Sequence, residues 1–185
     1  MAFEGDGDRD KAQRFRAAAL PYLDDVYTLA RYLLRNAADA EDAAQECYLR
    51  AFRHFDTFRG GPIKPWLLAI LRNVCRAEYA RRSALAAVQA DATDETDAAC
   101  ESLWGKAEPS PEGETLRRLD GETVQRLIAQ LPDQFREALV LREINDLSYR
   151  EIAEVIGTPV GTVMSRLARA RALLRDAWLK EEKEP

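Results

Sequence analysis

Two helix starts separated by a tight turn constrain this chain more than any other feature. They occur in the segment SYREIAEVIGTPVGTVMSRLARARALLR, residues 148–175. Ser148 and Glu151 form the S-x-x-E pattern of a capping box, which predicts that a first helix begins here. Gly157 is expected to end this helix, because a left-handed residue commonly follows a helix C-terminus.

A second helix is predicted to follow directly. Thr158 is a favourable N-cap, and Pro159 suits the first turn, where its missing N–H costs nothing. The apolar face of this helix consists of Val160, Val163, Leu167, Ala170 and Leu174. The opposite, outward face consists of Thr162, Ser165, Arg166 and Arg169.

Between residues 158 and 175 the chain has four arginines and no acid. Two short helices, a turn with glycine and a basic outward face predict a helix-turn-helix whose second helix enters a DNA major groove. An ordinary helical hairpin with a solvated basic face is the alternative. The charge segregation favours DNA binding, because a solvated face usually mixes signs to form i,i+4 pairs.

Composition excludes several other classes of protein. A chain of 185 residues allows one domain or two small ones. The longest apolar run, Trp66 to Leu71, is too short to span a membrane, and the acidic N-terminus lacks the apolar core of a secretory signal. Cys47, Cys75 and Cys100 form no C-x-x-C, and with a lone His54 they predict no metal site and no cofactor. We therefore expect a cytoplasmic protein without membrane insertion, in which Cys47 and Cys75 are buried thiols.

Charge is distributed unevenly along the chain, whose net charge is −5. Residues 83–120 carry three basic and nine acidic side chains, whereas residues 59–82 carry six basic and one acidic. Because an electrostatic footprint is local, the acidic total does not exclude nucleic acid as a partner.

The N-terminal half has a helical apolar pattern from Lys11 to Asn36, preceded by ten residues that we expect to be disordered. Its apolar positions are Phe15, Leu20, Leu23, Val26, Tyr27, Ala30 and Leu34. Pro21 is expected to divide it into a short leading helix and a longer one. Asp39 is a plausible N-cap for the next helix, about residues 40–55.

The helix at 40–55 has two distinct faces. Its expected core residues are Ala44, Cys47, Tyr48, Ala51, Phe52 and Phe55, and its outer residues are Asp42, Gln45, Glu46, Leu49, Arg50 and Arg53. Taken alone, the i,i+4 pair of Glu46 and Arg50 favours an ordinary solvated surface. The alternative is a docking surface in which Leu49 is an exposed apolar anchor.

A turn, FRGGP at residues 58–62, precedes a helix that Pro65 is expected to start. Its inward residues are Trp66, Leu67, Ile70, Leu71, Val74 and Tyr79, and its basic, amide-bearing stripe consists of Lys64, Arg72, Asn73, Arg76, Arg81 and Arg82. A basic loop with an aromatic residue suits single-stranded nucleic acid, whose unstacked base can meet Phe58. The alternative is that Phe58 and Trp66 belong to the core, which we favour for Trp66.

Residues 83–118 are rich in Ala, Asp, Glu, Pro and Ser and have weak apolar periodicity, as in a flexible acidic linker. Its Ala-rich start can extend the preceding helix, and Leu103-Trp104 is a candidate docking pair. Two amphipathic helices separated by Pro132 then lead to the helix-turn-helix. Their apolar positions are Leu119, Val124, Leu127, Ile128, Leu131, Phe135, Ala138, Leu139 and residues 141–144.

These segments together resemble a bacterial RNA polymerase sigma factor of the extracytoplasmic-function (ECF) class, which retains only regions 2 and 4. The resemblance covers about residues 12–82 and 119–177. It rests on DAEDAAQECYLRAFRHFDTF (39–58), PWLLAILRNVCRAEYARR (65–82) and LPDQFREALVLREINDLSYREIAEVIGTPVGTVMSRLARARALLR (131–175), in which PVGTVMSRLARAR is the most specific run.

The resemblance implies an all-α fold of two small helical domains, a region 2 bundle and a region 4 helix-turn-helix domain, joined by a flexible acidic linker. The expected boundaries are a disordered tail at 1–11, region 2 at 12–82, the linker at 83–118, region 4 at 119–178 and a tail at 179–185. The implied function is to bind core RNA polymerase and direct promoter recognition, local DNA melting and transcription initiation. An anti-sigma factor is a further expected partner, and no enzymatic activity is implied.

The resemblance also implies a role for each surface. Core polymerase binding is expected at Asp42, Gln45, Glu46 and Leu49, which replaces the solvated-surface interpretation. Contact with the melted −10 element is expected at Phe58, Arg59, Lys64, Trp66, Arg72, Asn73 and Arg76. Contact with the −35 element is expected at Thr162, Met164, Ser165, Arg166, Arg169 and Arg171.

The chain departs from the family pattern at several positions. Ala77 stands where an acid is common, Pro62 and Pro65 constrain the loop, and Met164 and Ala168 replace residues that are often polar or bulkier. The promoter sequence therefore cannot be transferred from a relative.

Two other functions compete with the sigma-factor interpretation. The main alternative is a helix-turn-helix regulator that has a sensory N-terminal domain and binds operators without polymerase. The basic stripe at 59–82 argues against it, because a sensory domain needs no second nucleic-acid surface. An enzyme using the acids at 39–46 is disfavoured, since no base or metal ligand pairs with them.

Overall fold

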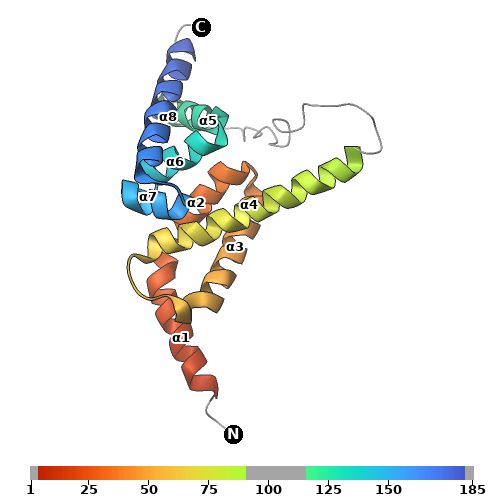
Figure 1. The fold of residues 1–185 in the computed structure, drawn as a ribbon, viewed down its shortest axis with the longest axis vertical. Helices are drawn as coiled ribbons and strands as arrows, with labels where there is room; N and C mark the ends of the chain where they lie inside the picture. Colours follow the sequence, from red (N-terminus) through yellow and green to blue (C-terminus); the bar gives the residue numbers. More distant parts are fainter. Residues whose placement is uncertain (1–3, 91–115, 182–185) are drawn as a thin grey trace. The chain divides into compact units, whose positions relative to one another are not determined.

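The computed structural model describes residues 4–90 and 116–181, and within these ranges its regular elements are helices, without strands (Figure 1). The chain divides into two compact units, residues 1–105 and 106–185. This architecture confirms the expected all-α fold of two small helical domains.

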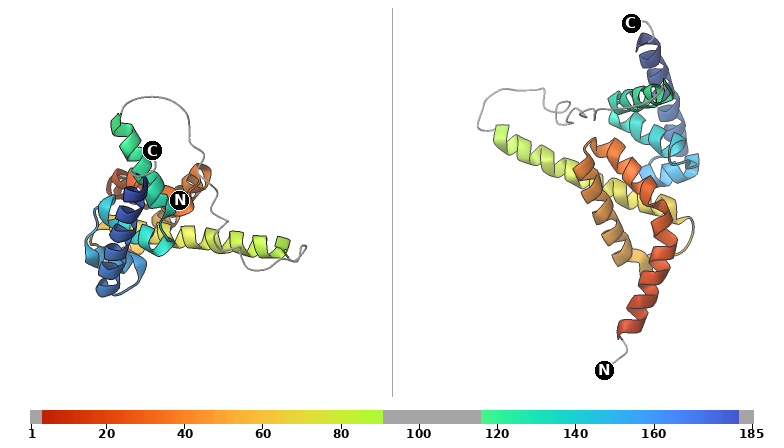
Figure 2. Two further views of the ribbon diagram at one scale, coloured as in Figure 1. Left: turned by 90° about the horizontal axis from the view of Figure 1, so that it is seen from above. Right: turned by 180° about the vertical axis from the view of Figure 1, so that it is seen from behind.

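The first unit is built on three mutually packed helices. Its elements are α1 (Glu4–Ala19), η1 (Leu20–Tyr22), α2 (Leu23–Leu34), α3 (Ala37–His54), η2 (Phe55–Thr57) and α4 (Ile63–Ala90). Helices α2, α3 and α4 pack against one another, and α1 contacts both α4 and η2 (Figures 1 and 2). The core they enclose contains Val26, Leu29, Ala30, Ala40, Cys47, Ala51, Leu67, Leu68 and Leu71, all fully buried.

The N-terminal helix differs from the sequence prediction. Helix α1 begins at Glu4, inside the segment 1–11 for which disorder was expected. It is also longer than α2, 16 residues against 12, so the predicted short leading helix is wrong. Burial of Phe15 against three aromatic rings of α3 and η2 stabilises α1. This is a tertiary contact that a local apolar pattern does not reveal.

The break between α1 and α2 was predicted correctly. Pro21 lies in the 3₁₀ turn η1, at the expected interruption. Leu20 and Leu23, expected in the core, are 45% and 47% exposed. A 3₁₀ turn has three residues per turn rather than 3.6, so it rotates these flanking positions away from the core face.

The start of α3 was predicted three residues too late. Asn36, not Asp39, is the N-cap, and its Oδ1 accepts a hydrogen bond of 3.1 Å from the Asp39 backbone N–H. Asp39 lies in the first turn instead, where its carboxylate forms an ion pair with Arg82 of α4. Both residues are good capping types, and the end of α2 at left-handed Arg35 selects the earlier one.

Helix α4 is longer than the segment that Pro65 was expected to start. It begins at Ile63 and continues to Ala90, in agreement with the expectation that the Ala-rich run extends it. Leu68 is buried in addition to predicted core residues, whereas Trp66 is only half-buried. Cys47 and Cys75 are buried thiols, as predicted. Leu103-Trp104 and Cys100 lie outside the described residues.

The second unit is centred on its last helix. It contains α5 (Leu116–Gln130), α6 (Asp133–Glu143), α7 (Tyr149–Ile156) and α8 (Val160–Glu181), and α8 contacts the other three. Its buried apolar side chains are Leu127, Ile128, Leu131, Ala138, Leu139, Val140, Leu141, Leu147, Ile152, Val155, Ile156, Val163, Leu167 and Ala170. Val160 and Ile144, expected to pack inward, are each 37% exposed because they lie at helix ends. Helix α8 also enters the expected tail at 179–185, where Glu181 forms an ion pair with Arg126.

A buried arginine joins α6 to the end of α5. Arg136 is fully buried, and its Nη1 donates hydrogen bonds to the carbonyl oxygens of Ala129 (3.1 Å) and Leu131 (2.8 Å). Its Nη2 donates to the Asp133 carboxylate. These bonds satisfy carbonyl oxygens at the end of a helix, which otherwise lack partners. The sequence pattern does not indicate this role.

Candidate polymerase and nucleic-acid interfaces

The first helix of the predicted helix-turn-helix has the expected ends. The Ser148 N–H donates to Glu151 Oε2 (2.8 Å), and the Glu151 N–H donates to Ser148 Oγ (3.3 Å), which completes the capping box. Gly157 ends α7 with a left-handed φ of 71°. The turn therefore has the stereochemistry predicted from sequence.

The start of α8 differs from the prediction in one detail. Thr158 is not its N-cap, since the buried Thr158 hydroxyl makes no hydrogen bond within the described residues. The Thr158 N–H instead donates back to the Ala153 carbonyl (3.1 Å), so this residue completes the C-terminus of α7. The hydrogen bonds of α8 begin at Pro159, whose carbonyl oxygen accepts from the N–H groups of Thr162 and Val163.

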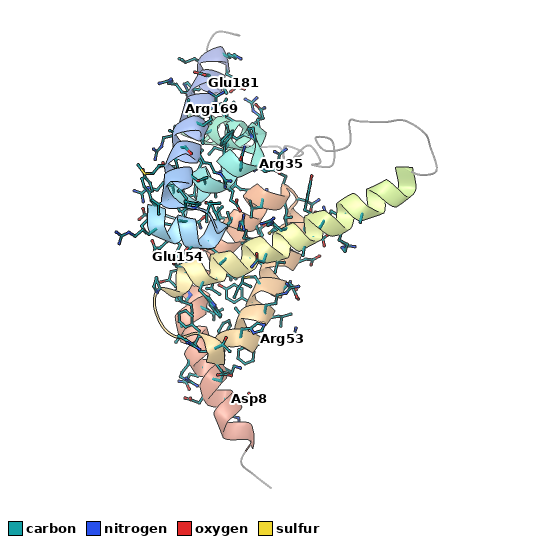
Figure 3. The ribbon with its side chains drawn as sticks, in the orientation of Figure 1. Asp8, Arg35, Arg53, Glu154, Arg169 and Glu181 are labelled. Carbon is teal, nitrogen blue, oxygen red and sulfur yellow. The ribbon has the colours of Figure 1, made fainter. Side chains whose placement is uncertain are left out.

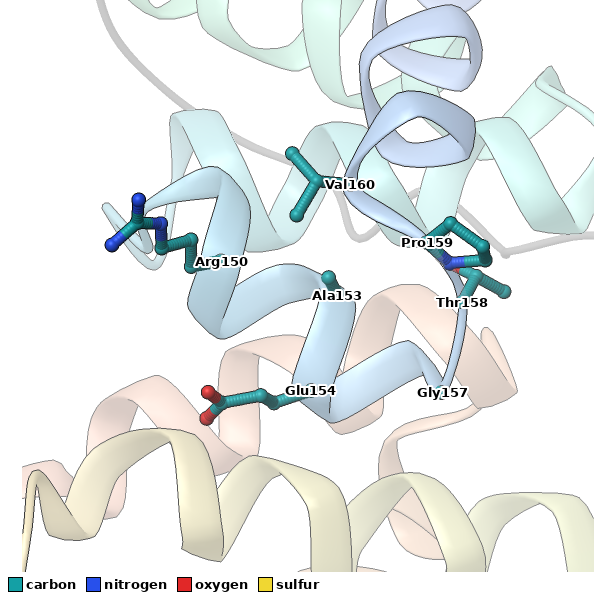
Figure 4. Close-up of a pocket in the computed structure, with 7 residues that line it drawn as sticks. All are labelled: Arg150, Ala153, Glu154, Gly157, Thr158, Pro159 and Val160. Carbon is teal, nitrogen blue, oxygen red and sulfur yellow. The ribbon is translucent and has the colours of Figure 1, made fainter.

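A pocket lies between α7 and the start of α8 (Figure 4). It is lined by Arg150, Ala153, Glu154, Gly157, Thr158, Pro159 and Val160. Its lining combines one arginine with one glutamate and so has no net charge for an ionic ligand. We assign no small-molecule role to it.

The outward face of α8 exposes most of the predicted −35 residues. Met164 is 53% exposed, and Ser165 is also exposed. Arg169, labelled in Figure 3, is exposed as well. Thr162 and Arg166 are half-buried. Ser165 Oγ donates to the Thr162 carbonyl (2.9 Å), so in the free chain this hydroxyl is bonded to its own helix.

Arg171 is the exception among the predicted −35 residues. Its guanidinium Nη2 lies 2.7 Å from Glu143 Oε1 of α6. Hydrogen bonds to Glu143 and then Tyr149 raise the pKa of Arg171 above its usual value. The Arg171 side chain is therefore held toward α6 and α7, although, like Arg169, it is exposed.

The predicted −10 loop depends on two glycines. Gly60 and Gly61 have φ angles of 89° and 100°, a region that residues with a Cβ rarely adopt. Phe58, at the start of the loop, is half-buried rather than free. Its ring stacks on Phe55 at a centroid distance of 6.3 Å and contacts Trp66 at 4.9 Å. Both aromatic residues thus combine partial burial with partial exposure.

The predicted basic stripe of α4 is divided by ion pairs. Arg59, Asn73 and Arg76 are exposed, and Arg72 is half-buried. Lys64 Nζ is instead 2.7 Å from the Asp25 carboxylate of α2.

Two further arginines of the stripe converge on one acid. Arg81 and Arg82 both donate to Glu78, at 2.7 Å and 2.8 Å, and Arg82 also pairs with Asp39. These hydrogen bonds, that from Arg81 first, lower the pKa of Glu78 to about 2. Arg81 and Arg82 are therefore partly neutralised within the chain.

The outer face of α3 has the composition of the predicted docking surface. Leu49 is 53% exposed, and Asp42 and Gln45 are exposed. Glu46 is half-buried and accepts a hydrogen bond of 2.6 Å from Arg50 Nε. Leu49 is therefore an exposed apolar side chain with polar neighbours on the same helix.

Within residues 4–90 and 116–181, no group of three or more His, Cys, Asp or Glu side chains could hold a metal ion. Over the same residues, no helix combines the length and the apolar character that crossing a membrane requires.

Comparison with known proteins identifies both units. Residues 19–86 match the sequence model of Sigma-70 region 2, and residues 116–174 match that of Sigma-70, region 4. The ECF RNA polymerase sigma factor SigE of Mycolicibacterium smegmatis is 33% identical over 182 residues, which span 98% of this chain and 68% of the relative. The chain belongs to the ECF class of RNA polymerase sigma factors.

Further relatives of this sigma factor agree. The RNA polymerase sigma-H factor of Pseudomonas aeruginosa is 35% identical over 174 residues, spanning 91% of this chain and 88% of that protein. Among solved structures, a co-crystal structure of the sigma factor RpoE with the anti-sigma factor NepR from Bartonella quintana superposes with a TM-score of 0.70. It shares 26% identity and covers 90% of this chain and 97% of RpoE.

Proposed function

We propose that this sigma factor uses three separate surfaces at a promoter. The outer face of α3 binds core RNA polymerase, the loop at 58–62 and the exposed side of α4 bind the melted −10 strand, and α8 reads the −35 duplex. The protein itself catalyses no reaction and acts in the cytoplasm, where polymerase meets the chromosome. The observation that supports this proposal is that the region 2 and region 4 matches fall in different units of a single ECF sigma chain.

The proposed −35 surface combines hydrogen-bond donors with an apolar side chain. An exposed arginine can donate two hydrogen bonds to the O6 and N7 atoms of guanine, which suits Arg169. Met164 can contact a thymine methyl group in the same groove. Ser165, Thr162 and Arg166 complete this surface. Arg171 is best placed to support it, because Glu143 holds its guanidinium.

The proposed −10 surface supplies positive charge and aromatic rings. Arg59 and Arg76 are exposed and can contact phosphates, while the Asn73 amide can donate to a base edge. The partly exposed rings of Phe58 and Trp66 can stack with an extruded base. Lys64 and Arg72 complete the set, although Lys64 must first leave Asp25 to reach a phosphate.

The proposed polymerase surface has an apolar centre and a polar rim, as protein interfaces commonly do. Leu49 is the anchor, and Asp42, Gln45 and Glu46 surround it on the same helix. The domain boundaries that we propose are 12–82 for region 2 and 119–178 for region 4. The acidic segment 83–118 between them has the right charge to thread a basic polymerase channel.

The two DNA surfaces are too small to act independently of polymerase. Each neutralised phosphate contributes about −0.9 to the slope of log affinity against log salt, and α8 has only four arginines between residues 158 and 175. Core polymerase would supply the remaining affinity and fix the spacing between the two surfaces. The RpoE–NepR complex supports an anti-sigma protein as a further partner.

A gel-shift experiment tests this function. Genomic DNA fragments of the source organism are incubated with the sigma factor alone, with core polymerase alone and with both. We expect a heparin-resistant complex only when both proteins are present. Tight, sequence-specific binding by the sigma factor alone would instead support the operator-binding regulator.

A further inference from the structure

Helix α1 precedes the part of the chain that matches region 2, which begins at residue 19. It nevertheless packs against η2, the 3₁₀ turn that leads into the loop at 58–62 (Figure 1). Phe15 is only 7% exposed, and its ring meets the rings of Phe52 and Phe55 edge-on at 5.4 Å and 5.3 Å. Helix α1 therefore closes the aromatic cluster from outside the matched region.

A continuous series of rings leads from α1 to α4. Phe15 contacts Phe55 at 5.3 Å, Phe55 stacks on Phe58 with an interplanar angle of 11°, and Phe58 contacts Trp66 at 4.9 Å. The series spans the loop, because Phe58 is its first residue and Trp66 lies in the first turns of α4. A shift of Phe15 would be transmitted to Phe58 through a single intervening ring.

The loop has little packing of its own. A Cβ built on Gly60 or Gly61 would meet nothing within 4 Å, so these two residues lie in open space. Glycine also leaves the backbone more conformational freedom than any other residue. The position of Phe58 must therefore be set by the rings that flank the loop rather than by the loop itself.

A polar contact fastens α1 to the same turn. Lys11 Nζ forms an ion pair with the carboxylate of Asp56 in η2 (2.5 Å) and lies 5.0 Å from the centroid of the Phe52 ring. The Lys11 side chain is only 15% exposed. One turn beyond Phe15, the Ala19 carbonyl accepts a hydrogen bond of 2.9 Å from the Tyr48 hydroxyl, which fixes the other end of the helix.

We propose that Phe15 and Lys11 are positioning residues for promoter opening. They hold η2 so that Phe58 presents its ring at the mouth of the loop, ready for a base extruded from the −10 element. Holding the ring in advance reduces the entropy lost when the base binds. This proposal rests on the proposed role of the loop in binding the −10 strand.

Charge reversal across the Lys11–Asp56 pair provides the test in the full-length chain. The variants are Lys11→Glu, Asp56→Lys and the double swap, and Arg14→Glu is the matched control. Arg14 undergoes the same charge change on the same helix, but it pairs with Asp10 within α1, and both side chains are more than half exposed. A Phe15→Leu variant tests the ring contact separately.

Hydrogen exchange followed by mass spectrometry measures the order of the loop without polymerase. We expect peptides that cover residues 55–64 to exchange about two- to fivefold faster in each single charge reversal, as for the loss of one ion pair. The double swap should restore most of the protection, and Arg14→Glu should leave it unchanged. Equal acceleration in Lys11→Glu and Arg14→Glu would overturn the proposed contact.

Promoter opening by the holoenzyme measures the consequence, with 2-aminopurine fluorescence in the −10 region as the signal. We expect Lys11→Glu and Phe15→Leu to slow opening at least about twofold while the affinity for core polymerase stays unchanged. Restoration of normal opening by the double swap would show that the Lys11–Asp56 ion pair, and not either residue alone, is required. Unchanged affinity for core polymerase would exclude a general folding defect, which would lower that affinity as well. Faster exchange with normal opening would overturn the positioning role. If even the wild-type holoenzyme opens no promoter, the proposed function fails. The hydrogen-exchange data still show whether the Lys11–Asp56 contact orders the loop.

Discussion

Arg171 of α8 and Glu143 of α6 form an ion pair with 2.7 Å between Nη2 and Oε1. Arg169, two residues earlier on the same helix, is exposed. The pair links α8 to α6 through Arg171. We propose different roles for the two arginines: Arg169 contacts DNA, and Arg171 supports the helix that carries it.

Replacing each arginine by alanine should separate these tasks. Loss of a base contact typically costs about 1–3 kcal/mol, so Arg169→Ala should lower −35-dependent transcription about 5- to 150-fold without affecting polymerase binding. Arg171→Ala should lower it only a few fold, since an exposed ion pair contributes about 0–1 kcal/mol to stability. Run-off assays on one promoter compare the variants. Equal losses, or a larger loss for Arg171→Ala, would refute the assignment.

An aspartate at Leu49 should weaken the complex with core polymerase. Leu49 is 53% exposed, so Leu49→Asp should fold normally while placing a charge at the centre of the proposed interface. Co-purification and fluorescence anisotropy with core enzyme measure the effect, which we expect to be at least about tenfold in Kd. Leu20→Asp is the control, because Leu20 is 45% exposed in the same unit but lies outside α3. Similar losses in both variants would argue against a specific docking surface.

The Glu78 ion pairs predict an acid-dependent contribution to stability. Arg81 and then Arg82 lower the pKa of Glu78 from 4.5 to about 2. Because the folded-state pKa is depressed, the contribution is complete above about pH 4.5 and is lost as the pH falls toward about 2. Glu78→Gln should therefore unfold more easily than wild type at pH 7, and the difference should shrink below pH 4.5.

Trp66 fluorescence in a Trp104→Phe, Trp178→Phe background reports on the first unit alone, since the chain has three tryptophans. Denaturant titrations at neutral and acidic pH then give the difference between wild type and Glu78→Gln. A difference that grows on acidification would contradict the assignment. Asp39→Asn, which removes a different partner of Arg82, is a useful comparison.

The buried thiol of Cys47 should be chemically inert in the native protein. Burial raises its pKa to about 12, so almost no thiolate is present at neutral pH. Its Sγ also donates to the Leu67 carbonyl (3.4 Å). Treatment with iodoacetamide followed by peptide mass spectrometry should label Cys47 only after denaturation. Rapid labelling of native protein would show that α3 and α4 separate readily.

Local features were predictable from sequence, whereas contacts between distant residues were not. The capping box of Ser148 and Glu151 and the left-handed Gly157 depend on residues within one turn, and both were predicted. The ion pair of Lys64 was not predicted, because its partner, Asp25, lies on another helix. Arg136 was missed because it binds backbone carbonyl groups, which have no sequence signature.

The N-terminal helix illustrates the same limit. Its register depends on Phe15 meeting an aromatic cluster from α3 and η2, and single apolar residues in a polar segment do not predict such a contact. The choice of Asn36 over Asp39 as N-cap also required the geometry of the preceding helix end. The predicted site residues, in contrast, lie mainly at exposed positions, because the helical period separates inner from outer faces.

Run-off transcription with purified core polymerase, followed by sequencing of the transcript starts on genomic DNA, tests the central claim most directly. The account predicts new starts only when the sigma factor is added, with two shared sequence blocks upstream at a fixed spacing. Arg169→Ala should reduce transcription only from promoters that depend on the upstream block farther from the start. Leu49→Asp should reduce transcription from every start. Two results would contradict promoter recognition by two surfaces. One is a set of transcript starts that does not change when the sigma factor is added, and the other is a set of new starts that share only one sequence block.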